Sequence, residues 1–169
     1  MSDFRRPGGP PVAFLLSQVG AGSARRFAKA LEPLDFAPWG AGILRLLSRM
    51  PGISQQELAA RLETHASRLV AMIDALEKRK LVVREPNPED RRLYCLRLTE
   101  AGERKLAEIG KVAQAHNREV CAGLDEREIQ QLGVLLEKLA GLHGLTPEVH
   151  PGYRDMEARE TDKPRRNAK

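Results

Sequence analysis

The chain has 169 residues, enough for one domain with a hydrophobic core and too few for two domains of ordinary size. Charged residues make up 30% of the chain and aromatic residues only 4%, which favours helices with solvated outer faces over a β-sandwich. Two cysteines without a pairing pattern, and no apolar run near the roughly 20 residues that span a bilayer, predict a cytoplasmic protein without a membrane partner.

The net charge of +5 indicates a polyanionic partner, but its distribution matters more than its sum. Residues 154–169 hold six Lys or Arg against four Asp or Glu, so they supply a large share of the excess. The rest of the chain is only mildly basic. An interpretation as a nucleic-acid binder must therefore depend on where individual arginines lie.

The first third of the chain predicts an arm and two helices. Residues 1–11 are rich in proline and glycine and are expected to form a flexible arm. From Val12, apolar residues recur at helical spacing up to Pro33, which should end the helix. A short second helix is expected from Pro38, which suits a first helical turn, to the residue before Pro51.

A capping signal opens the third predicted helix. Ser54 can cap the backbone amide of Glu57 while the Glu57 side chain reaches back to Ser54. After a linker at residues 62–64, the segment 65–79 predicts a further helix with one apolar stripe and one small, polar face. The stripe consists of Ala66, Leu69, Val70, Ile73 and Leu76, and the polar face of His65, Ser67, Arg68, Ala71, Asp74 and Lys78.

Two short alternating segments follow, "LVVRE" and "LYCLRL", and predict a two-stranded wing. Asp90, Arg91 and Arg92 would lie at its tip. The helices alone are equally consistent with a helical hairpin in an all-α core. The wing favours a winged helix-turn-helix, because the second helix can lie in a DNA major groove while a slim guanidinium enters the minor groove.

Two long helices are predicted after the wing, from Thr99 and from a capping box at Asp125 and Glu128. Their apolar seams contain Leu106, Ile109, Ala113, His116 and Val120 in the first, and Ile129, Leu132, Leu136 and Leu139 in the second. A monomer of this size has no obvious inner surface to cover both seams together with that of the first helix. We therefore expect a dimerisation layer of interlocking terminal helices.

The wing residues carry a family resemblance. Asp90-Arg91-Arg92, five further residues, then Leu98-Thr99 and Gly102, resemble the wing signature of the multiple antibiotic resistance regulator (MarR) family. "RLVAMIDALEKRKLVVRE" is similar to the end of that family's recognition helix, and the likeness runs from the first helix to about residue 142. The resemblance implies a mainly α winged-helix homodimer that binds pseudo-palindromic double-stranded DNA. It also implies repression of nearby genes and release by small phenolic or lipophilic ligands.

We therefore expect a domain of this type at residues 12–145, and the composition of the ends predicts a flexible arm at residues 1–11 and a flexible C-terminal tail at residues 146–169. The reading head would span about 34–98, and the dimerisation helices 12–32 and 99–143. The residues expected to contact DNA are Ser54, Gln55, His65, Ser67, Arg68, Arg91 and Arg92, with Asp90 orienting the wing.

Two residues depart from the family pattern. Lys80 stands where the family usually has a glycine after the recognition helix, so the left-handed C-cap is either strained or replaced by another turn. Ala37 stands where a Ser or Thr cap commonly precedes the second helix. Neither departure argues against the fold.

The segment "FAPWGAG" offers flat apolar walls beside small residues. It could form a pocket for a small aromatic or lipophilic effector, between this segment, Phe14 or Val19 on the first helix, and the fifth helix. Simple core packing is the alternative. The candidate ligand-binding residues are Phe14, Phe36, Trp39, Gly40 and His116.

Other chemistry finds little support in the sequence. Cys95 and Cys121 could act as redox sensors, but neither lies near the N-terminus, where some relatives of this family carry a sensing thiol. The four histidines show no zinc-site spacing, and no hydrolase, phosphate-loop or dinucleotide motif is present. We expect no cofactor, no metal and no enzymatic activity.

Three functions remain to be compared. The leading one is a dimeric, ligand-responsive transcription repressor associated with the nucleoid. The second is an architectural DNA-binding protein of the same fold that has no effector. The third, a dimerisation module of an enzyme, is disfavoured because Arg91 and Arg92 persist and no catalytic domain follows.

Overall fold

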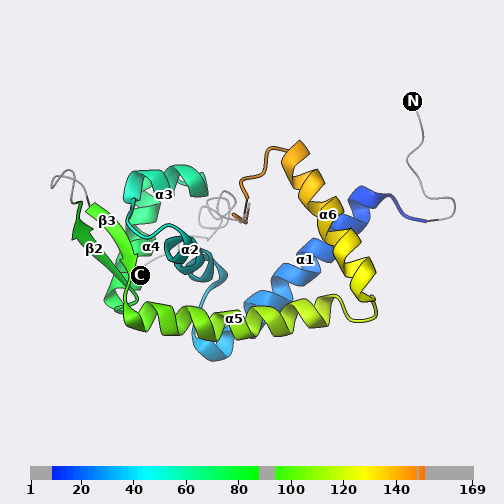
Figure 1. Cartoon of the computed structure of the whole chain (residues 1–169), viewed down its shortest axis with the longest axis horizontal. Coiled ribbons are helices and arrows are strands. Elements are labelled where there is room, and N and C mark those ends of the chain that lie inside the picture. Colours follow the sequence, from blue (N-terminus) through cyan, green and yellow to red (C-terminus); the bar gives the residue numbers. More distant parts are fainter. Residues whose placement is uncertain (1–8, 88–93, 148, 151–169) are drawn as a thin grey trace, which may run out of the picture.

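The computed structural model describes residues 9–87, 94–147 and 149–150, and shows a mainly helical chain with a small antiparallel sheet. Figure 1 shows that α2, α3, α4 and the sheet gather at one end and that α1 and α6 lie at the other. The long helix α5 runs past both groups. This arrangement confirms the expected winged helix-turn-helix with additional terminal helices.

The predicted helices and strands occur in the expected order, and the structure adds the short elements η1 and β1. They are α1 Val12–Leu31, the 3-10 helix η1 Glu32–Leu34, α2 Pro38–Arg49, β1 Ile53–Ser54, α3 Gln55–Leu62, α4 Ala66–Lys78, β2 Val82–Pro86, β3 Tyr94–Leu98, α5 Glu100–Val120 and α6 Glu126–Leu142. Pro33 lies in the 3-10 turn that follows α1, and Pro38 is the first residue of α2, as expected. Ala37 precedes α2 without a side-chain cap.

The hydrophobic core lies in the reading-head end of the molecule. Its largest fully buried side chains are Leu31, Ile43, Leu44, Leu47, Leu58, Leu62, Leu69, Ile73, Leu76, Val82 and Leu96. They come from the end of α1, from α2, α3 and α4, and from both wing strands. The helix-turn-helix and the wing therefore share one core, which fixes their relative position.

The sheet has three strands in the order β1-β3-β2, so the prediction of a two-stranded wing is incomplete. Strands β2 and β3 pair antiparallel from Val82 opposite Leu98 to Pro86 opposite Tyr94. The added strand β1 is only two residues long and pairs with β3. Its pairing places the start of α3 directly beside the wing.

The apolar stripe predicted for α4 is correct in part. Leu69, Ile73 and Leu76 are buried, and Met72 joins them. Ala66 and Val70, which were expected in the stripe, are exposed. The buried face includes Met72, and α3 and β2 pack against α4, whereas Val70 keeps 38% of its surface accessible.

The helices outside the reading head retain a large apolar surface. Apolar side chains with high exposure on α1 and α6 are Val12, Phe14, Leu16, Val19, Ile129, Leu132, Val134, Leu135, Leu136 and Leu142, which we call the exposed apolar set. Helix α6 has no buried residue. The seam of α5 differs from the prediction, since Ile109 is buried and Leu106 packs against the same core.

The chain between α4 and α5 forms a tight joint. Lys80 adopts the left-handed conformation with φ of 57°, so the unusual residue occupies the position where glycine is favoured. Thr99 Oγ1 donates to the carbonyl oxygen of Lys80 at 2.6 Å and accepts from the amide of Gly102 at 3.0 Å. The amide of Thr99 donates to the carbonyl oxygen of Leu81 at 3.1 Å.

Replacing Lys80 with glycine is expected to raise the free energy of unfolding by about 0.5 to 1 kcal/mol. Relief of the left-handed strain outweighs the extra freedom that glycine gains in the unfolded chain. Urea denaturation at one protein concentration measures the change. Lys78→Gly, in the last turn of α4, is the control and should lower the stability. If both variants lose stability, the left-handed conformation of Lys80 is not strained.

The chain returns to the reading head after α6. We call residues 143–150, apart from the undescribed residue 148, the return segment (Figure 1). Thr146 Oγ1 donates to Glu63 Oε1 at 2.8 Å, and Val149 packs against the core. The expectation of a flexible tail from residue 146 did not anticipate these contacts.

Candidate nucleic-acid interface

The start of α3 is fixed by the predicted capping box. The Ser54 hydroxyl accepts from the amide of Glu57 at 3.1 Å, and the Ser54 amide donates to Glu57 Oε2 at 3.0 Å. The hydrogen bonds from the Ser54 side chain and backbone hold the pKa of Glu57 below its ordinary value. The Ser54 hydroxyl also donates to Glu57 at 2.7 Å, so this side chain is engaged in the cap.

Helix α4 presents the polar face that the sequence predicts. His65 is its N-cap residue and is exposed together with Ser67, while Arg68 is half-buried. Ala71 is exposed one turn after Ser67, so this part of the face has only small side chains. A helix with an exposed face of small and hydrogen-bonding residues can approach base edges closely.

Arg84 of β2 joins the wing to both helices of the helix-turn-helix. Its Nη2 donates to Asp74 Oδ1 at 2.7 Å, its Nη1 donates to Glu77, and its Nε donates to Gln55 Oε1 at 3.3 Å. The predicted DNA-contacting residue Gln55 therefore has its carbonyl oxygen turned toward Arg84. Arg84 was not among the predicted functional residues, since its only signal in the sequence is its place in an alternating strand.

The wing strands lead away from this cluster. Glu85 and Arg97 form an ion pair across β2 and β3 with 3.0 Å between Glu85 Oε2 and Arg97 Nε. The last paired residues before the tip are Pro86 and Tyr94. Asp90, Arg91 and Arg92 lie outside the described residues.

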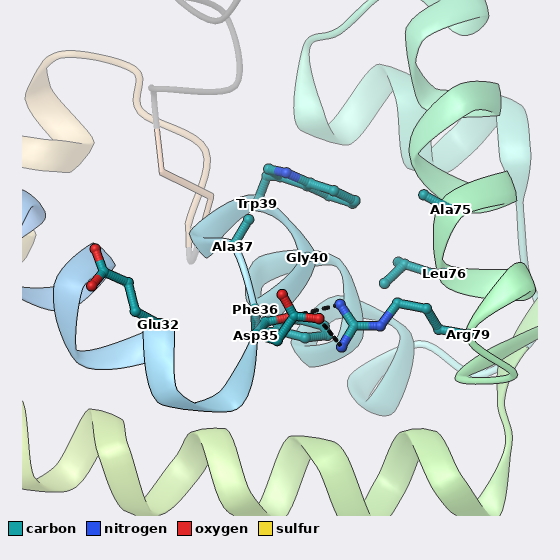
Figure 2. Close-up of a pocket in the computed structure, with 9 residues that line it drawn as sticks. All are labelled: Glu32, Asp35, Phe36, Ala37, Trp39, Gly40, Ala75, Leu76 and Arg79. Carbon is teal, nitrogen blue, oxygen red and sulfur yellow. Dashed lines mark hydrogen bonds and ion pairs between the residues drawn. The ribbon is translucent and has the colours of Figure 1, made fainter.

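A groove of about 400 Å³ lies beside the start of α2. It is lined by Glu32, Asp35, Phe36, Ala37, Trp39, Gly40, Ala75, Leu76 and Arg79 (Figure 2). Phe36, Trp39 and Gly40 were predicted ligand-binding residues. The opposite wall differs from the prediction, because it comes from α4 and not from α5 or the Phe14 end of α1.

Arg79 closes one side of the groove (Figure 2). Its Nη1 donates to the carbonyl oxygen of Asp35 at 2.8 Å, and its Nη2 lies 3.6 Å from Asp35 Oδ2. The guanidinium carbon also lies 4.9 Å from the centre of the Phe36 ring, a cation–π contact. Gly40 permits this placement of Phe36, since a Cβ at Gly40 would lie 2.8 Å from the ring.

The two remaining predicted ligand residues lie apart from the groove. Phe14 belongs to the exposed apolar set, with 56% of its surface accessible. His116 contacts α1, where its Nε2 lies 3.0 Å from Ser23 Oγ and its ring centre lies 5.4 Å from that of Phe27. His116 therefore links α5 to α1, because both of its neighbours belong to that helix.

The described residues contain no group of three or more His, Cys, Asp or Glu side chains that could hold a metal ion. Cys95 is a buried free thiol in β3, and Cys121 is a half-buried free thiol at the end of α5. None of the helices in the described ranges is both long and apolar enough to cross a membrane.

Comparisons with known proteins agree with this geometry. A model of the MarR family matches residues 42–94. A transcriptional regulatory protein assigned to the hcr operon of Thauera aromatica is 31% identical over 137 residues, which cover 80% of this chain and 82% of the relative.

Solved structures are similar over most of the fold. The transcriptional repressor CouR, bound to a 23-mer DNA duplex, has a TM-score of 0.69 and 32% identity, covering 76% of this chain and 92% of that one. A MarR family protein of Mycobacterium tuberculosis in complex with DNA has a TM-score of 0.68 and 27% identity, covering 78% and 98%. With a winged helix-turn-helix, a polar recognition face and these similarities, the chain belongs to the MarR family of transcriptional regulators.

Proposed function

We propose that this regulator binds a pseudo-palindromic operator as a homodimer and represses transcription from it. Helix α4 enters the major groove through Ser67 and Arg68, and the wing places Arg92 in the adjoining minor groove. The observation that carries the proposal is the exposed, small-residue face of α4, held beside the wing by Arg84. In this proposal the protein acts in the cytoplasm, associated with the nucleoid, and has no enzymatic activity.

The dimer follows from the exposed apolar set on α1 and α6. An apolar surface of this extent is rarely left in water, and a second copy of the chain offers the matching surface. We assign residues 12–32 and 99–143 to the dimer layer and about 34–98 to the reading head. Two-fold symmetry then requires two half-sites whose centres lie about 10 bp apart, so that the two α4 helices enter the major groove one helical turn from each other.

Replacing Arg92 with alanine is expected to weaken operator binding and to lower its salt dependence. The slope of log affinity against log salt should fall by roughly 0.9 for each phosphate that the variant no longer neutralises. Replacing Arg68 should instead relax base preference, by about 1 to 3 kcal/mol for a bidentate hydrogen-bonded pair. Titrations of a labelled duplex at several salt concentrations separate the two effects.

Arg127→Ala on α6 removes the same charge far from the wing and serves as the control. It should leave both affinity and salt slope close to those of the parent. If Arg92→Ala binds as tightly as the parent at physiological salt, the wing does not contact DNA and this mode of binding is wrong.

We further propose that the groove beside Trp39 binds an aromatic or lipophilic effector. Its walls come from η1 and α2 on one side and from α4 on the other, so an occupant contacts the recognition helix directly. An effector changes DNA affinity only through its different affinity for the bound and released arrangements. Displacing the Arg79 side chain from Asp35 is one local change that would alter the position of α4.

Binding of an aromatic acid in this groove is expected to quench the fluorescence of Trp39, the single tryptophan of the chain. The same compound should lower operator affinity. Ala75→Leu, which narrows the groove from the α4 side, should weaken the quenching. If a broad panel of aromatic compounds changes neither fluorescence nor DNA affinity, the protein acts as an architectural DNA-binding protein without an effector.

A further inference from the structure

The helix-turn-helix contains more acidic than basic residues, although it is proposed to bind the negatively charged DNA. From Gln55 to Lys78, helices α3 and α4 and their turn hold three Lys or Arg residues and four Asp or Glu residues. Asp74 lies three residues after Ala71 and seven after Ser67, so it continues the polar face of α4. A free carboxylate at that position would face the DNA phosphates and be repelled.

Arg84 sets one positive charge against the two carboxylates at this acidic end of the face. One guanidinium donates to Asp74, to Glu77 and to Gln55, so each of its three nitrogens has a partner from the helix-turn-helix. The Arg84 side chain is 19% exposed, while those of Asp74 and Glu77 are 46% and 39% exposed. The carboxylates therefore lie nearer to solvent than the cation that compensates them.

The same cluster orients the Gln55 amide. A guanidinium only donates hydrogen bonds, so the group facing it must be the carbonyl oxygen of Gln55. The amide NH₂ of Gln55 is then turned away from Arg84 and remains a donor at the start of α3. A donor at a helix N-terminus is suited to an acceptor such as a phosphate oxygen.

We infer that Arg84 is a positioning residue for DNA binding, which offsets one of the two negative charges of Asp74 and Glu77 and orients Gln55, and does not itself contact a phosphate. This inference rests on the proposed function. It differs from the ordinary role of an arginine in such proteins, because the benefit of Arg84 depends entirely on its carboxylate partners. Removing those partners should make Arg84 dispensable.

A double-mutant cycle tests this dependence. The probe is the duplex that the parent protein enriches from a randomised DNA pool. Arg84→Gln should weaken binding of this duplex by about tenfold or more, since it leaves two carboxylates uncompensated. In a protein that already carries Asp74→Asn and Glu77→Gln, the same Arg84→Gln change should alter affinity by less than about threefold.

Arg84→Lys keeps one charge but loses the planar fork, so its affinity should lie between those of the parent and Arg84→Gln. Thermal unfolding and the oligomeric state of each variant are measured in parallel. If Arg84→Gln does not fold on its own, the change is measured in the protein with Asp74→Asn and Glu77→Gln, where a direct DNA contact would still lower affinity and a positioning role would change it by less than about threefold.

The outcomes are distinct. A loss of affinity that is equal in both backgrounds would show that Arg84 touches DNA directly, and an unchanged affinity for every Arg84 variant would show that it plays no part in binding. Either result overturns the inference and leaves the proposed function intact. Failure of the parent to enrich any sequence would instead refute the proposed function.

Discussion

Replacing Gly102 with alanine is expected to lower the free energy of unfolding by about 3 kcal/mol or more. A Cβ at this position would lie 2.0 Å from the carbonyl oxygen of Leu81, which is rigid backbone. That oxygen already accepts from the amide of Thr99, so it cannot move without breaking the joint between α4 and α5. Chemical denaturation followed by circular dichroism measures the loss.

Gly110 on the same helix provides a matched control. A Cβ there would meet no atom within 4 Å, so alanine should be neutral or should stabilise the helix by up to about 1 kcal/mol. If Gly102→Ala lowers the free energy of unfolding and Gly110→Ala does not, the loss at Gly102 is due to the close approach of Leu81. Equal effects would mean that the joint is not tightly packed.

Introducing glutamate at both Leu132 and Leu136 is expected to convert the protein into a monomer and to lower operator affinity about 10² to 10⁴-fold. Both side chains lie on α6 and belong to the exposed apolar set. Two carboxylates in an apolar interface would lose their hydration without gaining partners. A monomer would also lose the gain in affinity that comes from engaging two linked half-sites.

The charge-matched control is Gln130→Glu with Gln131→Glu. Gln131 lies four residues after Arg127 and seven before Lys138, and Gln130 lies four after Glu126 and seven before Glu137, so both positions neighbour charged residues on α6. This variant should remain dimeric by analytical ultracentrifugation and should bind the duplex about as tightly as the parent does. A dimeric Leu132→Glu, Leu136→Glu protein would place the interface elsewhere.

Local signals in the sequence predicted much of the reading head. The Ser54 and Glu57 capping box, the prolines around α2 and the two wing strands depend on neighbouring residues, and the structure confirms each of them. The burial of the strands does not alternate, however, since Cys95 and Leu96 are both buried. The polar face of α4 was also predictable, because a period of 3.6 residues separates it from the buried side.

Features that depend on distant residues were not predictable. Strand β1 is too short to show alternation, and only pairing with β3 defines it. The exposure of Val70 depends on which side of α4 the neighbouring elements cover. The groove beside Trp39 was placed against the wrong helix, since its α4 wall is some 35 residues away in sequence and no local pattern links the two.

The hydrogen bond between Thr146 and Glu63 connects the end of α6 to the helix-turn-helix. The two residues are 83 positions apart along the chain, yet the return segment brings Thr146 onto the turn between α3 and α4 only four residues after α6 ends. While this hydrogen bond is made, a change in the tilt of α6 can reach that turn through the return segment as well as through α5. The end of α6 and the turn between α3 and α4 would then move together.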